Sequence, residues 1–78
     1  MNVNEAVARR IREYQEKEKL SIARLAMLSN VPASTVKDIL NGRTKGTGID
    51  TLYKIASGLD ISVRDFFDCD LFDKEMDE

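Results

Sequence analysis

Apolar residues recur along the chain at helical spacing, in stretches separated by turn-forming or polar segments. In the first stretch they lie at i, i+1, i+4 and i+7, on one face of a helix, and they are Val7, Ala8, Ile11 and Tyr14. Asn2 and Asn4 precede this stretch, and Asn is a residue type that caps helix N-termini well. The pattern therefore predicts a first helix that begins near one of these residues and ends near Lys19.

Residues 21–42 form the most informative stretch of the chain, because they predict two short helices joined by a tight turn. Ser21 is a good N-cap for the first of these helices, whose buried face consists of Ile22, Leu25 and Ala26. Asn30 follows its end, where a left-handed residue is needed, and Asn tolerates that conformation better than most residues. Pro32 then stops the helix and suits the start of a new one.

The second helix of this pair is predicted from about Ala33 to Asn41, with Gly42 at its end. Its core-facing residues are spaced i, i+3 and i+4, and they are Val36, Ile39 and Leu40. The residues of its opposite face, which we call the polar stripe, are Ala33, Ser34, Lys37, Asp38 and Asn41. A flexible and cationic loop, residues 43–48, follows this helix.

Two further helices are predicted toward the C-terminus. The first runs from about residue 49 to residue 59, and its apolar face consists of Ile49, Leu52, Ile55, Ala56 and Leu59. Gly58 is expected to weaken this helix slightly. The second has a strong start signal, because Ser62 and Asp65 make a capping box while Ile61 and Phe66 make a hydrophobic staple. The sequence thus predicts an all-α fold with five helices.

Composition narrows the chemistry that this fold can perform. The chain of 78 residues has the length of one domain and contains no histidine, which removes Ser-His and Cys-His nucleophile pairs and the commonest metal ligand. Its single cysteine, Cys69, forms no internal disulfide and suits a reducing cytoplasm. We therefore expect no enzyme, no metal site and no cofactor. No apolar run is long enough to span a membrane, and no secretory pattern opens the chain.

Charge is distributed unevenly along the chain, although the formal net charge is only −2. Residues 1–59 hold ten basic and six acidic residues, a net charge of +4, whereas residues 60–78 hold two basic and eight acidic residues, a net charge of −6. A polyanionic partner meets a local patch of the surface and not the average charge. The acidic overall balance therefore does not exclude nucleic acid as a partner.

The ordered set of apolar and turn residues resembles the lambda-repressor/Cro-like helix-turn-helix proteins of phages and bacteria. The resemblance covers about residues 6–67 and is carried by Leu20-Ser21, Leu25-Ala26, Val36, Leu40-Asn41-Gly42, Leu52, Ile55-Ala56, Leu59, Ile61-Ser62 and Phe66-Phe67. It implies a compact five-helix DNA-binding domain whose second and third helices form the helix-turn-helix. In such a domain the third helix, about residues 33–41, enters the major groove of double-stranded DNA.

The resemblance also implies a role for individual residues. Base edges are contacted from the start of the third helix and one turn later, which here are Ala33, Ser34, Lys37 and Asp38. Backbone phosphates are gripped by flanking residues, which here are Asn41, Arg43, Thr44, Lys45 and Arg24. Ser34 can form hydrogen bonds with several base edges, and Asp38 is repelled by phosphates. We therefore expect moderate sequence specificity, part of which comes from DNA shape.

The chain departs from the family pattern at several positions. Ile22 stands where a Gln that bonds phosphate is common, and Pro32 stands where a polar N-cap is common. The family often pairs an Arg of the first helix with a Glu before the Asn-Gly turn, and the matching positions hold Gln15 and Leu40. Both partners are replaced together, so no unpaired buried charge results.

The C-terminal part of the chain is expected to provide the contact between two copies. Members of this family usually bind as dimers, and the interface candidates are Phe67, Leu71 and Phe72. The alternative is that these residues fold back locally. We expect a DNA-binding domain over residues 1–68 and an acidic tail over residues 69–78, which is either a disordered solubilising end or a charge that competes with phosphate for the basic face.

These expectations favour a sequence-specific transcriptional regulator of a bacterium or mobile element, and specifically a repressor. Its expected location is the cytoplasm, with the nucleoid, and its expected partners are double-stranded DNA and a second copy of the chain. A protein partner is a further candidate, which belongs to the alternatives below. One alternative is the DNA-binding antitoxin of a toxin–antitoxin pair. Another is a protein-interaction module that has lost DNA binding. The residues that favour this alternative are Ile22, Ala33 and Asp38.

Overall fold

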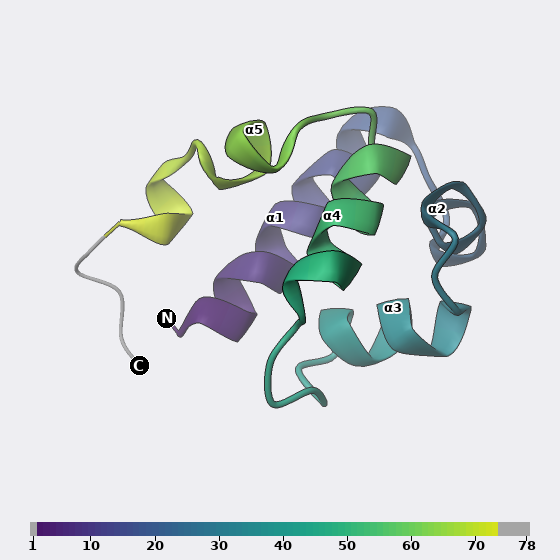
Figure 1. Cartoon of the computed structure of the whole chain (residues 1–78), viewed down its shortest axis with the longest axis horizontal. Coiled ribbons are helices and arrows are strands. Elements are labelled where there is room, and N and C mark those ends of the chain that lie inside the picture. The colour runs from purple at the N-terminus through teal and green to yellow at the C-terminus, as the bar shows by residue number, and fades with distance from the viewer. Residues whose placement is uncertain (1, 74–78) are drawn as a thin grey trace.

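The computed structural model describes residues 2–73, in which five α-helices and one 3-10 turn are the regular elements (Figure 1). Their bounds are α1 Val3–Glu18, α2 Ile22–Ser29, α3 Ala33–Leu40, α4 Ile49–Gly58, α5 Val63–Phe67 and the 3-10 turn η1 Asp70–Phe72. The expected all-α fold of five helices is thereby confirmed. In the described part of the chain, no helix is both long and apolar enough to cross a membrane.

Short polar side chains begin three of the helices, as expected from the sequence. Asn2 Oδ1 accepts a hydrogen bond from the Glu5 backbone N–H at 2.9 Å, and Glu5 Oε1 accepts from the Asn2 N–H at 3.1 Å, which completes a capping box for α1. Ser21 Oγ accepts from the Arg24 N–H at 3.0 Å and begins α2. Ser62 starts α5 in the same manner, with the Asp65 N–H as donor at 3.0 Å.

The capping box expected for α5 is only half formed. Among the hydrogen bonds of residues 2–73, the Asp65 carboxylate makes none to the Ser62 backbone N–H, whereas the longer Glu5 side chain makes the equivalent bond in α1. An Asp side chain is one methylene shorter than the Glu or Gln that usually closes this motif. The hydrophobic staple is consistent with the packing, because Phe66 lies in the core and Ile61 packs against it.

Left-handed residues end the first three helices. Asn30 ends α2 at φ 55°, as the sequence predicted, and Gly42 follows α3 at φ 70°. Lys19 ends α1 at φ 56°, a conformation that the sequence did not indicate, because a Lys rarely adopts it. After these turns, α2 packs against both α3 and α4.

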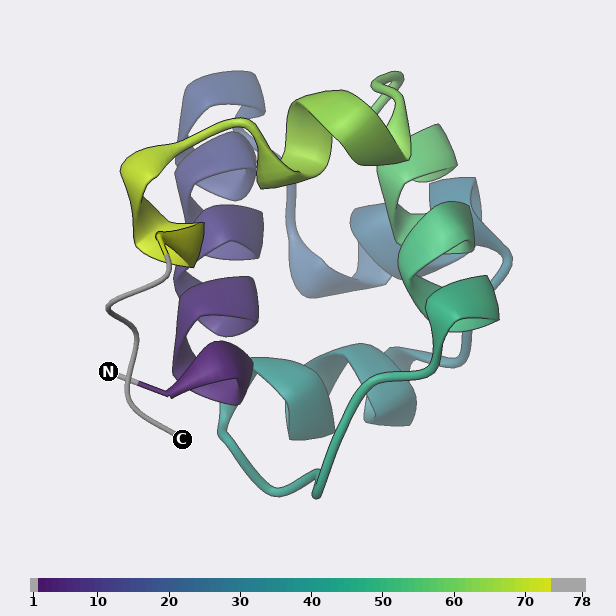
Figure 2. The same cartoon turned by 60° about the vertical axis from the view of Figure 1, so that its left-hand side comes forward.

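The core lies between α1 and α4, with α3 at one end of the molecule and α5 at the other (Figures 1 and 2). α2 packs chiefly on α4, and α1 packs on α3. The buried cluster consists of Val7, Ile11, Leu25, Ala26, Val31, Val36, Ile39, Leu40, Leu52, Ile55, Leu59 and Phe66. α3 therefore contributes one apolar side to this cluster and leaves its other side at the edge of the molecule.

One expectation for α4 was wrong, and one glycine has a role that the sequence did not indicate. Ile49 was assigned to its apolar face but is 72% exposed, because it is the first helical residue and lies one turn beyond the edge of the core. Gly58, which the sequence predicts to weaken the helix slightly, also lies against Ser29 of α2. A Cβ added at Gly58 would overlap Ser29 Oγ and lie 2.9 Å from the Ser29 backbone N.

The chain after α5 folds back onto the domain. Phe66 is buried, and Phe67 and Phe72 are half-buried, with ring centroids 5.3 Å apart for Phe66 and Phe67 and 4.6 Å apart for Phe67 and Phe72. η1 packs against α1. Residues 69–73, which the sequence assigned to the acidic tail, are thus continuous with the folded domain. The rest of the expected tail, residues 74–78, lies outside the described residues.

Candidate nucleic-acid interface

The polar stripe of α3 is fully on the surface. Ala33, Ser34, Lys37, Asp38 and Asn41 are all exposed. The opposite side of the helix is closed, since Val36 is 0%, Ile39 3% and Leu40 6% exposed. This arrangement matches the two faces expected from the spacing of the residues. α3 forms one end of the molecule (Figure 2), so none of the other helices of residues 2–73 covers the stripe.

The turn between α2 and α3 fixes the start of the stripe. The Val31 backbone N–H donates to the Ala26 carbonyl at 3.1 Å, and the Val31 side chain is buried. Pro32 occupies the N-cap position of α3 and makes no side-chain capping bond. Among residues 2–73, no side chain accepts a hydrogen bond from the first N–H groups of α3, at the end that carries Ala33 and Ser34.

The carbonyl groups at the other end of α3 are all satisfied. The backbone N–H groups of Asn41, Gly42 and Arg43 supply three of these bonds, to the carbonyls of Lys37, Ile39 and Asp38 at 2.9, 3.3 and 2.9 Å. The Leu40 carbonyl accepts from Arg12 Nη2 of α1 at 3.0 Å. A positive side chain near the C-terminus of a helix also interacts favourably with its dipole.

Arg12 was not identified as a site residue from the sequence. The position where the family often has an Arg holds Gln15, whose Nε2 bonds the Leu20 carbonyl at 3.2 Å. Arg12 joins α1 to α3 from one turn earlier in α1, and its acceptor is the main chain of Leu40. Because any residue type supplies a main-chain carbonyl, no signal in the sequence pointed to this contact.

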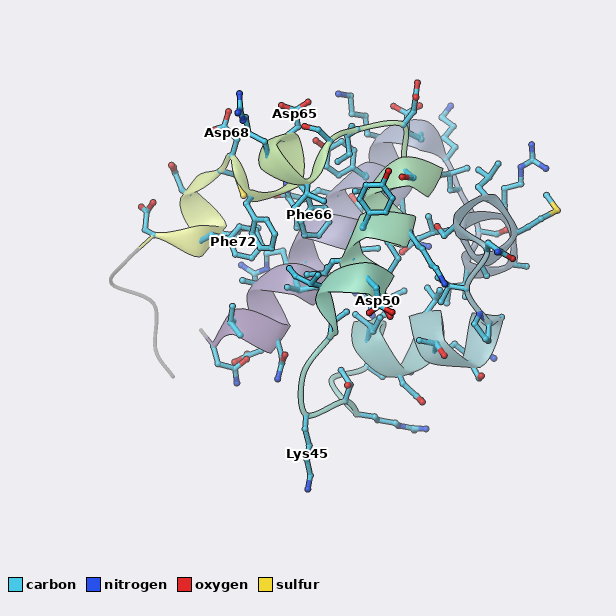
Figure 3. The ribbon with its side chains drawn as sticks, in the orientation of Figure 1. Lys45, Asp50, Asp65, Phe66, Asp68 and Phe72 are labelled. Atoms are coloured by element: carbon cyan, nitrogen blue, oxygen red, sulfur yellow. The ribbon has the colours of Figure 1, made fainter. Side chains whose placement is uncertain are left out.

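The loop between α3 and α4 carries two exposed cations beside the stripe, Arg43 and Lys45. Lys45 projects away from the body of the molecule (Figure 3), while its carbonyl accepts from Asn4 Nδ2 of α1 at 3.1 Å. Thr44 is half-buried, and its hydroxyl bonds the Gly46 carbonyl at 2.8 Å. The Thr44 side chain thus shapes the loop from within, and Arg43 and Lys45 supply its charge.

A polar hollow separates this loop from α3. Its volume is about 370 Å³, and its lining includes Asp38 of the stripe, Arg43 and Lys45 of the loop, and Thr51 of α4. Arg24, the remaining candidate cation, lies exposed in the first turn of α2. Among residues 2–73, no group of three or more His, Cys, Asp or Glu side chains is placed to hold a metal ion.

Comparison with known proteins gives a consistent result. A sequence model of the Cro/C1-type helix-turn-helix DNA-binding domain matches residues 10–71. No curated protein matches the chain significantly. Among solved structures, prophage Lp1 protein 11 is 35% identical with a TM-score of 0.80, over 94% of this chain and 99% of that protein.

Two bacterial structures extend this similarity. The restriction-modification controller protein C.AhdI from Aeromonas hydrophila is 30% identical with a TM-score of 0.75, over 82% of this chain and 96% of its own. An HTH_3 family transcriptional regulator from Vibrio cholerae is 32% identical with a TM-score of 0.77, over 87% of this chain. This chain covers 38% of the Vibrio cholerae protein, which is therefore much longer.

Proposed function

Because the chain belongs to the family of Cro/C1-type helix-turn-helix DNA-binding domains, we propose that it is a repressor that inserts α3 into the major groove of its operator. The observation that supports this most directly is the exposed polar stripe with cationic residues beside it. The major groove admits a single α-helix, and recognition helices use their N-terminal residues to contact base edges. The open first turn of α3 suits that placement.

The stripe offers a small set of base contacts. Lys37 donates to guanine O6 or N7, and Ser34 bonds several base edges and so discriminates little among them. Ala33 suits contact with a thymine methyl group, and Asp38 accepts from cytosine N4. We therefore propose that Lys37 and Asp38 carry most of the direct sequence preference, and that DNA deformability supplies part of the remainder.

Phosphate contacts are assigned to the rim of the stripe. Arg43 and Lys45 are exposed on the loop that follows α3, Asn41 ends the stripe, and Arg24 lies on α2. Such contacts orient a protein on the duplex without reading its sequence. Thr44 contributes by holding the loop through its bond to Gly46 and not by a direct contact.

A second copy of the chain is proposed to complete the operator complex. One recognition helix makes few base contacts, and helix-turn-helix dimers place two of them about one helical turn of DNA apart. Phe67, Leu71 and Phe72 are half-buried in one protomer, which leaves part of each side chain for a partner. We propose that this dimer represses by occupying its operator.

The test is selection of bound duplexes from a random DNA pool, followed by anisotropy titrations on the selected site. Lys37→Ala is expected to weaken that site by about 1–3 kcal/mol and to relax the preference at one base pair. The matched control is Arg64→Ala, which removes the same charge from α5 at the far end of the molecule. No enriched sequence, or equal effects of the two variants, would overturn the assignment of α3 as the reading helix.

A further inference from the structure

The three arginines of α1 face two different parts of the molecule. Arg10 turns to α5, where its Nε and Nη2 donate to the carbonyls of Phe66 and Asp65, each at 2.7 Å. Arg9 and Arg12 lie at i and i+3 and share another side of the helix with Glu5 and Ala8. This second side faces the C-terminal end of α3.

A groove of about 340 Å³ runs between this side of α1 and the end of α3. Arg9, Arg12 and Glu5 line it from α1, and Asn41 and Gly42 line it from the end of α3. Asn41 is also the last residue of the polar stripe. The groove is therefore continuous with the surface on which the duplex is proposed to lie.

The groove carries a net positive charge. Both arginines are exposed, and among residues 2–73 neither is paired with a carboxylate, whereas Arg10 is paired with Glu13 at 3.3 Å. Glu5 Oε1 accepts from the Asn2 N–H at 3.1 Å, so the capping box holds this carboxylate at the start of α1. One carboxylate thus faces two guanidinium groups.

Arg12 is also held in place before any ligand arrives. One of its five donors bonds the Leu40 carbonyl at 3.0 Å, which leaves the others for a second acceptor. A guanidinium group matches the geometry of a phosphate, with two parallel N–H bonds to two oxygens. Little side-chain entropy remains to be lost when such a prepositioned group binds.

We propose that the groove binds a backbone phosphate of the DNA duplex, with Arg9 and Arg12 as its ligands. This inference rests on the proposed function, because the same duplex must lie on α3. The proposed site adds a phosphate contact from α1 to the phosphate contacts made by the loop between α3 and α4. The protein then binds phosphates on both sides of the C-terminal end of α3. Arg12, which belongs to α1, then contacts both the phosphate and the end of α3.

The experiment uses the full chain and duplex DNA, with affinity measured as a function of salt. Arg9→Ala is expected to reduce the slope of log K against log salt by about 0.9 per bound protomer and to leave the selected sequence unchanged. Arg9→Lys is expected to restore the slope. Glu5→Gln keeps an oxygen for the capping box and removes the opposing charge, so it is expected to tighten binding at low salt.

The controls distinguish this inference from the function on which it rests. Arg64→Ala changes the same charge on α5 and is expected to leave the slope unchanged. If Arg9→Ala behaves as Arg64→Ala does, the groove is not a phosphate site, even though α3 still binds DNA. If Arg12→Met lowers affinity only together with the melting temperature while Arg9→Ala has no effect, Arg12 is a helix cap alone and the proposal is overturned. Salt-independent binding by the unaltered protein would overturn the proposed function itself.

Discussion

At the scale of single residues, the contact between Gly58 and Ser29 leaves no room for a side chain at position 58. α2 and α4 approach so closely there that the Ser29 side chain is buried and its hydroxyl has no hydrogen-bond partner among residues 2–73. A hydroxyl in such a place costs free energy. The close approach of the two helices is thus retained despite an unsatisfied polar atom, which indicates that packing between α2 and α4 dominates locally.

Gly58→Ala is expected to lower the free energy of unfolding by about 1–3 kcal/mol, because its Cβ overlaps Ser29 Oγ and lies 2.9 Å from the Ser29 backbone N. The higher helix propensity of Ala, about 1 kcal/mol, offsets only part of this cost. Urea denaturation measures the change. Gly46→Ala is the matched control, since a Cβ there meets nothing within 4 Å.

Ser29→Ala separates the two parts of this clash. It removes the hydroxyl but not the backbone N, so Gly58→Ala is expected to remain destabilising in that background, by a smaller amount. A Gly58→Ala protein as stable as the Gly46→Ala protein would show that α4 shifts away from α2 at little cost, and would refute this account of the glycine.

At the scale of helices, the sequence predicted the caps and turns that depend on residues close together in the chain. The N-caps Asn2, Ser21 and Ser62 and the left-handed Asn30 act within about one turn, so residue type and spacing reveal them. The spacing of apolar residues likewise predicted both faces of α3, and with them the polar stripe. The candidate site was therefore largely predictable from the sequence, apart from the contribution of α1.

Contacts between distant residues were not predictable in this way. Arg10 bonds carbonyls 55 and 56 residues away, and Arg12 bonds one 28 residues away. Every residue has a main-chain carbonyl, so residue type does not reveal which carbonyl accepts such a bond. The exposure of Ile49 also depends on where the core ends, and helical spacing alone does not contain that information.

Arg10 is expected to be the residue that holds α5 in place. α5 has five residues, which is too short to be stable alone, and the guanidinium group of Arg10 donates to its Asp65 and Phe66 carbonyls. Arg10→Met is expected to lower the free energy of unfolding by about 1.5–3 kcal/mol, because hydrogen bonds to a charged group are lost. Hydrogen exchange is expected to accelerate more at the amides of α5 than at those of α2.

Arg9→Met is the matched control for this change. It makes the same substitution one residue earlier, on a side chain that has no contact with α5 in the hydrogen bonds of the described residues. Its α5 amides are expected to exchange as in the unaltered protein. Equal protection of α5 in both variants would show that burial of Phe66 alone holds this helix.

At the scale of the whole molecule, two acids of the C-terminal part lie on the side of the molecule opposite the loop that follows α3. The molecule measures 33 × 24 × 22 Å. Asp65 and Asp68 lie near α5 at one end, and Lys45 lies beyond α3 at the other (Figure 3). The distance over which exposed charges act is about 8–10 Å at physiological salt. The acids near α5 are therefore expected to be screened from a duplex on α3.

This separation predicts that two substitutions with the same effect on net charge differ in their effect on DNA binding. Asp38→Asn, on the polar stripe, is expected to tighten binding to non-specific duplex by about 0.5 kcal/mol, roughly twofold, because an exposed like charge beside the phosphates is removed. Asp68→Asn is expected to leave the affinity unchanged. Anisotropy with a random-sequence duplex at about 0.1 M salt, where the screening length is about 10 Å, measures both. Equal tightening by the two variants would mean that net charge governs the encounter and that the opposite ends of this fold are not electrostatically separate.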